Sequence, residues 1–402
     1  MSDRLVKLLT SLRLTVVLLS AGLALVFVGT LAQVHEGLYQ AQARYFKSFF
    51  VWKPTIGDTT WPILLPGGYL IGSLLLLNLL AAHATRFKFT KKKIGIAMIH
   101  LGIILLLVGQ MLTDVLARES YMLLSSEGPA KDYSESSMRN ELAVIDVTDA
   151  DADEVIAIPE SRLKGEIRHP KLPFALRVKQ YSPNSLPQLL APMAGQTRHD
   201  IQGAGQFIVF APQPLTTKSD SRNLPAATVE LLAGKESLGT WEVSNWLSEG
   251  ALVKEMQQQS GGALNGVLGA PQAFQYQGRT YHLAMRPVRY YNPFSIQLLH
   301  FTHAVYRGTD TPKDFTSRIR LSNPQTGENR EVKIYMNNPL RYDGITFYQG
   351  SYDPKDPRVS ILQVVKNPSW LTPYFSCVLV GLGLIVQFLT HLFGFAMKWR
   401  TA

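Results

Sequence analysis

Cysteine is almost absent from this chain of 402 residues, which contains a single one, Cys377. It lies inside an apolar run near the C-terminus, so the long polar segment before that run has none. Disulfide bonds, CxxC redox chemistry and cysteine-ligated zinc are therefore excluded from the polar segment. The CxxCH motif that attaches c-type haem is also missing from the chain.

Sequence motifs of self-contained enzymes are missing as well. The chain has no G-x-S-x-G, H-E-x-x-H or P-loop sequence. His300 and His303 are three residues apart in a predicted strand, where they would point to opposite faces and chelate poorly. His282 reads as an ordinary sheet histidine. We therefore expect no self-contained catalytic site, although the chain can still belong to a catalytic complex.

Acidic residues are scarce in one part of the chain, which explains its net charge of +10. Residues 114–366 are neutral, with 27 Lys/Arg and 27 Asp/Glu, and the rest has 13 basic and 3 acidic residues. The basic excess falls in short segments beside apolar runs, as at Lys91, Lys92 and Lys93. This is the positive-inside pattern of membrane proteins, so we predict no nucleic-acid partner and both termini in the cytoplasm.

Four apolar runs are each long enough to cross a bilayer as one helix. They divide the chain into a membrane region (1–113), a large polar domain (114–367) and a final span with a short tail (368–402). The spans are expected at about 14–34, 61–83, 94–113 and 371–395.

The polar domain has the texture of a β structure. Short runs such as NELAVIDV, FALRVKQY and FSIQLLHF are rich in Val, Ile, Tyr and Phe and are punctuated by Pro, Gly and Asn. The expected fold is thus a membrane protein with four transmembrane α-helices and a large all-β extracytoplasmic domain between helices three and four. That domain should be sandwich-like or an open barrel, in one or two lobes.

Two aromatic-rich stretches have more than one interpretation. Residues 43–52, ARYFKSFFVW, fit either a helix in the membrane interface plane or a loop with aromatic anchors. The tyrosine-rich end of the domain fits either a packed strand pair or a docking surface; its aromatic residues are Tyr335, Tyr342, Phe347, Tyr348 and Tyr352.

The third apolar run, 94–113, contains one ionisable residue, His100. Gly95, Gly102 and Gly109 recur on a different helical face, where small residues let another helix approach closely. A histidine in an apolar slot needs a partner. It could bond to Asn78, to a backbone carbonyl or to water, or it could be an axial ligand of haem iron. In the second case another ligand would come from His83 or from a partner subunit.

Three stretches of the chain resemble the ResB family. They are SLRLTVVLLSAGLALVFVGTLAQ near the N-terminus, LLNLLAAHATRF followed by IHLGIILLLVGQ, and YMNNPLRYDGITFYQGSYD leading into VVKNPSW. Their order, and the large loop before the fourth span, also match the family. The middle of the domain, at about 180–275, adds little to the resemblance.

The resemblance implies a role in System II cytochrome c biogenesis at the cytoplasmic membrane. ResB-like proteins work with a ResC/CcsA-like membrane subunit, and together they resemble a cytochrome c synthase. Such a complex exports haem b and joins it to the CxxCH thiols of an apocytochrome c, with thiol-reducing proteins of the pathway as further partners. His100 falls at the position of the family's transmembrane haem ligand, and His83 is a weaker candidate.

Two other functions were weighed against haem handling. One is a non-catalytic scaffold, which would bind apocytochrome by adding a strand to an exposed sheet edge or would stabilise the haem-carrying partner. The other is a solute transporter, which the lack of visible repeats or broken-helix pairs argues against.

Overall fold

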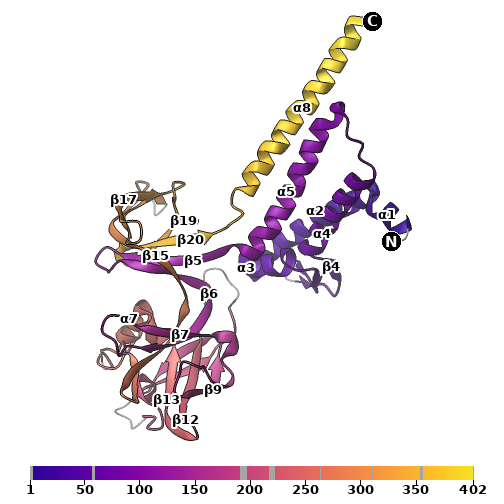
Figure 1. The fold of residues 1–402 in the computed structure, drawn as a ribbon. Coiled ribbons are helices and arrows are strands. Elements are labelled where there is room, and N and C mark those ends of the chain that lie inside the picture. Colours follow the sequence, from indigo (N-terminus) through magenta and orange to yellow (C-terminus); the bar gives the residue numbers. More distant parts are fainter. Residues whose placement is uncertain are drawn as a thin grey trace.

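The computed structural model describes residues 3–56, 59–190, 197–216, 222–262, 264–308, 312–353 and 356–401. Within these ranges, four helices are long and apolar enough to cross a membrane. They are α2 (Leu12–Glu36), α4 (Gly68–Thr85), α5 (Ile94–Leu116) and α8 (Thr372–Thr401), and a short helix α1 (Asp3–Leu9) precedes them. The chain is therefore membrane-anchored, with a β domain between α5 and α8 as predicted (Figure 1).

Helix α4 is shorter than its apolar run. The expected span at 61–83 begins instead at Gly68, because residues Leu64–Pro66 form strand β4. Pro66 has no backbone N–H, and the chain then makes a close approach to Ser48 and Phe46 at Gly67 and Gly68, where a side chain would collide with backbone atoms.

The aromatic stretch before α4 is not one helix, so the predicted interfacial helix is wrong. Helix α3 (Leu38–Ala41) continues into a π-helical turn, η1 (Gln42–Phe46). Strand β1 (Phe50–Trp52) then pairs with β4 in antiparallel register, and β2 (Thr55–Ile56) pairs with β3 (Thr59–Thr60). We call residues 49–66 the aromatic ribbon.

The aromatic ribbon has one buried and one exposed face, because side chains alternate along a strand. Val51 and the neighbouring Tyr45 are fully buried against α2 and α4. Phe50, Trp52 and Leu64 are more than half exposed on the opposite face. A salt bridge of 2.5 Å from Lys47 to Asp114 fixes this region beside the domain-side end of α5.

We expect this exposed face to lie in the lipid interface, where Trp residues are favoured. In proteoliposomes, the fluorescence of Trp52 and Trp61 should be quenched more by lipids brominated near the headgroup than by lipids brominated at the chain ends. The contribution of each of these two residues to the fluorescence is obtained as the difference between the wild type and the Trp52→Phe or Trp61→Phe variant. Trp241, which is 4% exposed in the β domain, provides the unquenched reference. Equal quenching of all three would contradict the placement.

The β domain contains the remaining sheets. Its strands are β5 (Arg118–Ser125), β6 (Lys131–Asp146), β7 (Glu154–Pro159), β8 (Gly165–Ile167), β9 (Ala175–Ser182), β10 (Ser185–Leu189), β11 (Ile208–Pro212), β12 (Ala226–Ala233), β13 (Glu236–Ser244), β14 (Gln272–Tyr276), β15 (Arg279–Val305), β16 (Pro312–Asn323), β17 (Glu328–Tyr335), β18 (Leu340–Tyr342), β19 (Ile345–Asp353) and β20 (Asp356–Lys366). Two helices, α6 (Asn245–Ser248) and α7 (Gly250–Gln259), follow β13.

The domain has two lobes joined by the long strands β6 and β15 (Figure 1). The lobe next to the helices is a nearly closed sheet in the order β17-β16-β15-β6-β5-β20-β19-β18. Its core contains Met122, Phe294, Ile319 and Phe347. The distant lobe packs the sheet β13-β12-β9-β8 against the other ends of β6 and β15. Both lobes therefore share the same two strands, and each has its own apolar core.

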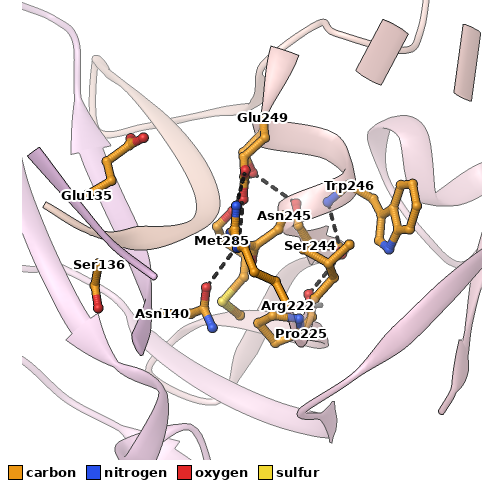
Figure 2. A network of polar contacts seen from close by, with 12 residues as sticks. Glu135, Ser136, Asn140, Arg222, Pro225, Ser244, Asn245, Trp246, Glu249 and Met285 are labelled. Carbon is orange, nitrogen blue, oxygen red and sulfur yellow. Dashed lines mark hydrogen bonds and ion pairs between the residues drawn. The ribbon is translucent and has the colours of Figure 1, made fainter. Parts of the chain in front are cut away.

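A polar network attaches helices α6 and α7 to strand β6 (Figure 2). The buried amide of Asn245 donates to Asn140 Oδ1 at 2.9 Å and to Glu249 Oε1 at 2.8 Å. The Arg222 guanidinium donates two hydrogen bonds, of 2.8 and 2.9 Å, to the Glu249 carboxylate. Charge-assisted, bidentate contacts of this kind fix geometry well.

Strands β5 and β20 connect the domain to the membrane helices. They pair along their whole length, and α5 runs directly into β5 while α8 follows β20. The Thr113 and Ser369 hydroxyls are hydrogen-bonded at 2.8 Å, and Asn367 donates to Thr113 at 3.3 Å. We call these three residues the outer clasp, since they tie the two helices together where the domain begins.

Candidate functional site: a pair of intramembrane histidines

Helix α5 packs its glycine face against α8. A Cβ at Gly95 would lie 2.6 Å from the Gly383 carbonyl oxygen, and one at Gly102 would lie 2.5 Å from Val380 Cγ2. All three glycines of this face are buried. The neighbour expected for the glycine seam is therefore α8, within the same chain.

His100 lies on the other side of α5. It is six residues from the first residue of the helix, or ~9 Å along the axis. Farther along this face, Ile103 is 37% and Met111 55% exposed. The His100 face is thus left open by this chain over much of its length, whereas the glycine face is closed.

The structure brings the two predicted site histidines together. His100 Nδ1 lies 3.1 Å from His83 Nε2, and the two rings are nearly perpendicular, at 87°. Both side chains are half-buried where the end of α4 meets the beginning of α5. The sequence placed both residues at the same end of neighbouring antiparallel helices, but it did not show that they touch.

His83 is held by its own helix. Its Nδ1 lies 3.0 Å from the carbonyl oxygen of Leu79, one turn earlier, and its ring stacks at 4.8 Å on Phe87, which follows the end of the helix. Residues four apart on a helix share a face, so the spacing of Leu79 and His83 within α4 was a sequence signal for the first of these contacts. We had not used it.

The alternative bond from His100 to Asn78 is wrong. The buried Asn78 amide donates to the Leu9 carbonyl at 2.6 Å and to the Ser11 carbonyl at 3.2 Å, and its Oδ1 accepts from Thr15 at 2.7 Å. Asn78 is therefore fully used in joining α4 to the N-terminal end of α2. This leaves His83 as the partner of His100.

Other histidines do not form a comparable pair. His303 stacks between Phe315 and Tyr352, at 4.9 and 4.3 Å, and His300 is exposed on the same strand. His391, which was not among the residues predicted from the sequence, is exposed on α8, and its Nε2 lies 2.8 Å from Gln387 Nε2. Within the described residues, no three His, Cys, Asp or Glu side chains gather as metal ligands.

In the tyrosine-rich end of the domain, some aromatic residues pack in the core and others are exposed. Phe347 is fully buried, and Tyr342 packs edge-on against Phe294 at 4.9 Å, so these two belong to the core. Tyr335 and Tyr348 are 37% and 36% exposed. Of these four residues, Tyr335 and Tyr348 are the ones accessible to a docking protein.

The two histidines are too few to hold a bare metal ion, so the question is whether they fit haem iron. A bare metal ion needs three or four protein ligands, whereas haem iron needs one or two axial ones. His83 lies against the Nδ1 edge of His100, so it cannot bind the opposite face of an iron held by His100 Nε2. The residues present therefore fit one axial bond from this chain, beside an open apolar face.

Comparison with known proteins finds a family similarity within the β domain. A family model described as ResB-like family matches residues 273–361. The chain is also 36% identical over 103 residues to Protein NrfI of Wolinella succinogenes. That match covers 26% of this chain and 11% of NrfI, so the chain spans a small part of this relative. Residues 273–361 run from β14 through most of β20, so the match covers strands of both lobes, and the similarity to the ResB-like family is shown for this part of the chain.

Proposed function

We propose that this chain is a haem-handling subunit of a System II cytochrome c biogenesis complex. The match of residues 273–361 to the ResB-like family model, together with the similarity to Protein NrfI, supports a role in cytochrome c biogenesis. His100 supports the haem part of the proposal, because it is an imidazole inside a membrane helix on a face that the chain leaves open. Haem b is the cargo in this proposal.

The proposed orientation follows from charge. Lys91, Lys92 and Lys93 stand at the beginning of α5, at the end far from the β domain. The positive-inside tendency favours the cytoplasm for that end, and therefore an extracytoplasmic β domain with both termini inside. His100 then lies in the half of the membrane that haem from the cytoplasm would enter first.

A ResC/CcsA-like membrane subunit is the proposed partner, and an apocytochrome c receives the haem. The partner would cover the open face of α5 and provide the second axial ligand. In this arrangement His100 binds and orients haem, while the attachment chemistry at CxxCH belongs to the complex. The chain has no thiol in its β domain that could compete for the haem vinyl groups.

His100→Ala should remove most of the haem that copurifies with the complex, a loss of at least about tenfold, since no other described side chain occupies its place. The complex with the ResC-like subunit is purified in detergent, and haem is measured from its absorption band per mole of protein. His391→Ala is the matched control, because His391 is also a helix histidine but is exposed on α8.

Unchanged haem content in His100→Ala would contradict the proposal. So would an equal loss in His391→Ala. If His100→Ala still supports maturation of an apocytochrome, the scaffold function replaces haem handling as the role of this chain.

A further inference from the structure

The hydrogen bonds around His83 have a fixed direction. A backbone carbonyl can accept a proton but cannot donate one, so His83 Nδ1, at 3.0 Å from the Leu79 oxygen, must bear the hydrogen. A neutral imidazole has one N–H, so His83 Nε2 is then the acceptor. Charging the ring instead would be costly among apolar side chains in a membrane.

The same reasoning determines which nitrogen of His100 bears the hydrogen. Its Nδ1 faces His83 Nε2 at 3.1 Å, and two acceptor nitrogens cannot bond to each other. His100 Nδ1 must therefore donate. In the neutral ring this leaves the lone pair of His100 on Nε2, which is the nitrogen on the far side of the ring from His83.

From this chain of donors we infer that His83 is a positioning residue, which holds His100 in the tautomer whose Nε2 is free to bind iron. The inference about the tautomer stands on the geometry alone, and its use for haem rests on the proposed function. His83 is thereby given a role other than that of a weak ligand candidate.

The position of His83 makes this role effective. It is held between the Leu79 carbonyl of its own helix and the Phe87 ring of the loop that follows, so it offers His100 a fixed acceptor. The two rings are nearly perpendicular, at 87°, and His83 Nε2 lies within hydrogen-bond distance of His100 Nδ1, at 3.1 Å. Acceptors of this kind fix the tautomer and ring orientation of a metal-binding histidine, raise its basicity, and typically change metal affinity by about 10–100-fold.

Nitrogen NMR of the full chain tests the tautomer without haem. The protein is labelled with ¹⁵N-histidine in lipid bilayers, and the His100 signals are assigned from the His100→Ala spectrum. Protonated and unprotonated ring nitrogens have well-separated shifts. We expect His100 to be protonated at Nδ1 and unprotonated at Nε2; a His100 protonated at Nε2 overturns the inference, whether or not haem binds.

Two variants test the positioning role in the complex with its partner. His83→Leu removes the acceptor and should weaken haem binding by about 10–100-fold, while raising the reduction potential of the bound haem because the ligand becomes less basic. His83→Gln places a carbonyl oxygen near the position of Nε2 and should restore both properties in large part. Wild-type affinity and potential in His83→Leu would overturn the role.

The two proposals fail in different ways. If the wild-type complex binds no haem at His100 but the NMR spectrum shows the expected tautomer, haem handling is wrong and the hydrogen-bond chain remains. If haem binds through His100 but the spectrum shows the other tautomer, haem handling remains and the role of His83 is wrong.

Discussion

Replacing Glu141 by leucine should lower the free energy of unfolding by about 3–5 kcal/mol. Glu141 accepts a hydrogen bond of 3.1 Å from Arg286 Nε, and the two side chains are 7% and 6% exposed. They are direct partners across strands β6 and β15, which hold the two lobes together. The substitution would leave the Arg286 charge buried without its counter-charge, which is the costly way to break a buried ion pair.

The double variant Glu141→Leu/Arg286→Met should recover most of that loss, because an apolar pair removes the burial cost of both charges. Thermal unfolding of the full chain in detergent, followed by tryptophan fluorescence, measures both variants. Glu127→Leu is the control, since the Glu127–Arg358 pair is 68% and 53% exposed and should matter little. An equal effect at Glu127 and Glu141 would contradict the argument from burial.

Gly383→Ala should weaken the packing of α5 on α8 by about 1–3 kcal/mol, the usual cost of overpacking. The new methyl group would lie 2.8 Å from the Gly95 carbonyl oxygen and 2.9 Å from the Ile99 nitrogen. Both are backbone atoms, which cannot rotate away as a side chain could. The two helices must therefore separate, and the melting temperature of the full chain in detergent should fall.

Gly381 provides the matched control on the same helix. A Cβ built at Gly381 meets no atom within 4 Å. Gly381→Ala should therefore leave the melting temperature unchanged or raise it slightly, since alanine favours the helix by about 1 kcal/mol over glycine. A similar decrease in both variants would show that the effect does not come from the α5–α8 contact.

Periodicity predicted the features that depend on a single helix. The span of α5, the position of His100 and the glycine face all follow from residues on one element, and the structure agrees with each. The contact of His100 with His83 depends on how α4 is rotated about its axis, which the sequence of α4 does not specify. The sequence also did not predict which helix packs on the glycine face, because a face of small residues accepts any helix that packs closely.

Composition predicted secondary structure less well in apolar segments that can form either a strand or a helix. Residues 61–66 are as apolar as a membrane span, yet they lie outside the helix, which begins only after Pro66 and Gly67, and Leu64–Pro66 form strand β4. The run FSIQLLHF, at 294–301, indicated only part of strand β15. In the structure the strand is continuous, and its register shifts against β6 occur beside Pro287 and near Pro293, where a ladder hydrogen bond is lost anyway.

The outer clasp makes the β domain and the pair α5–α8 a lever with its pivot at the membrane surface. Its short arm is the paired base of β5 and β20, and its long arm is α5, on which His100 lies 16 residues from Leu116, or ~24 Å away. A turn of the domain by about 5° would thus displace His100 by ~2 Å along this rigid arm. That is enough to break a hydrogen bond of 3.1 Å to His83, so the contact between the two histidines depends on the angle between the domain and α5.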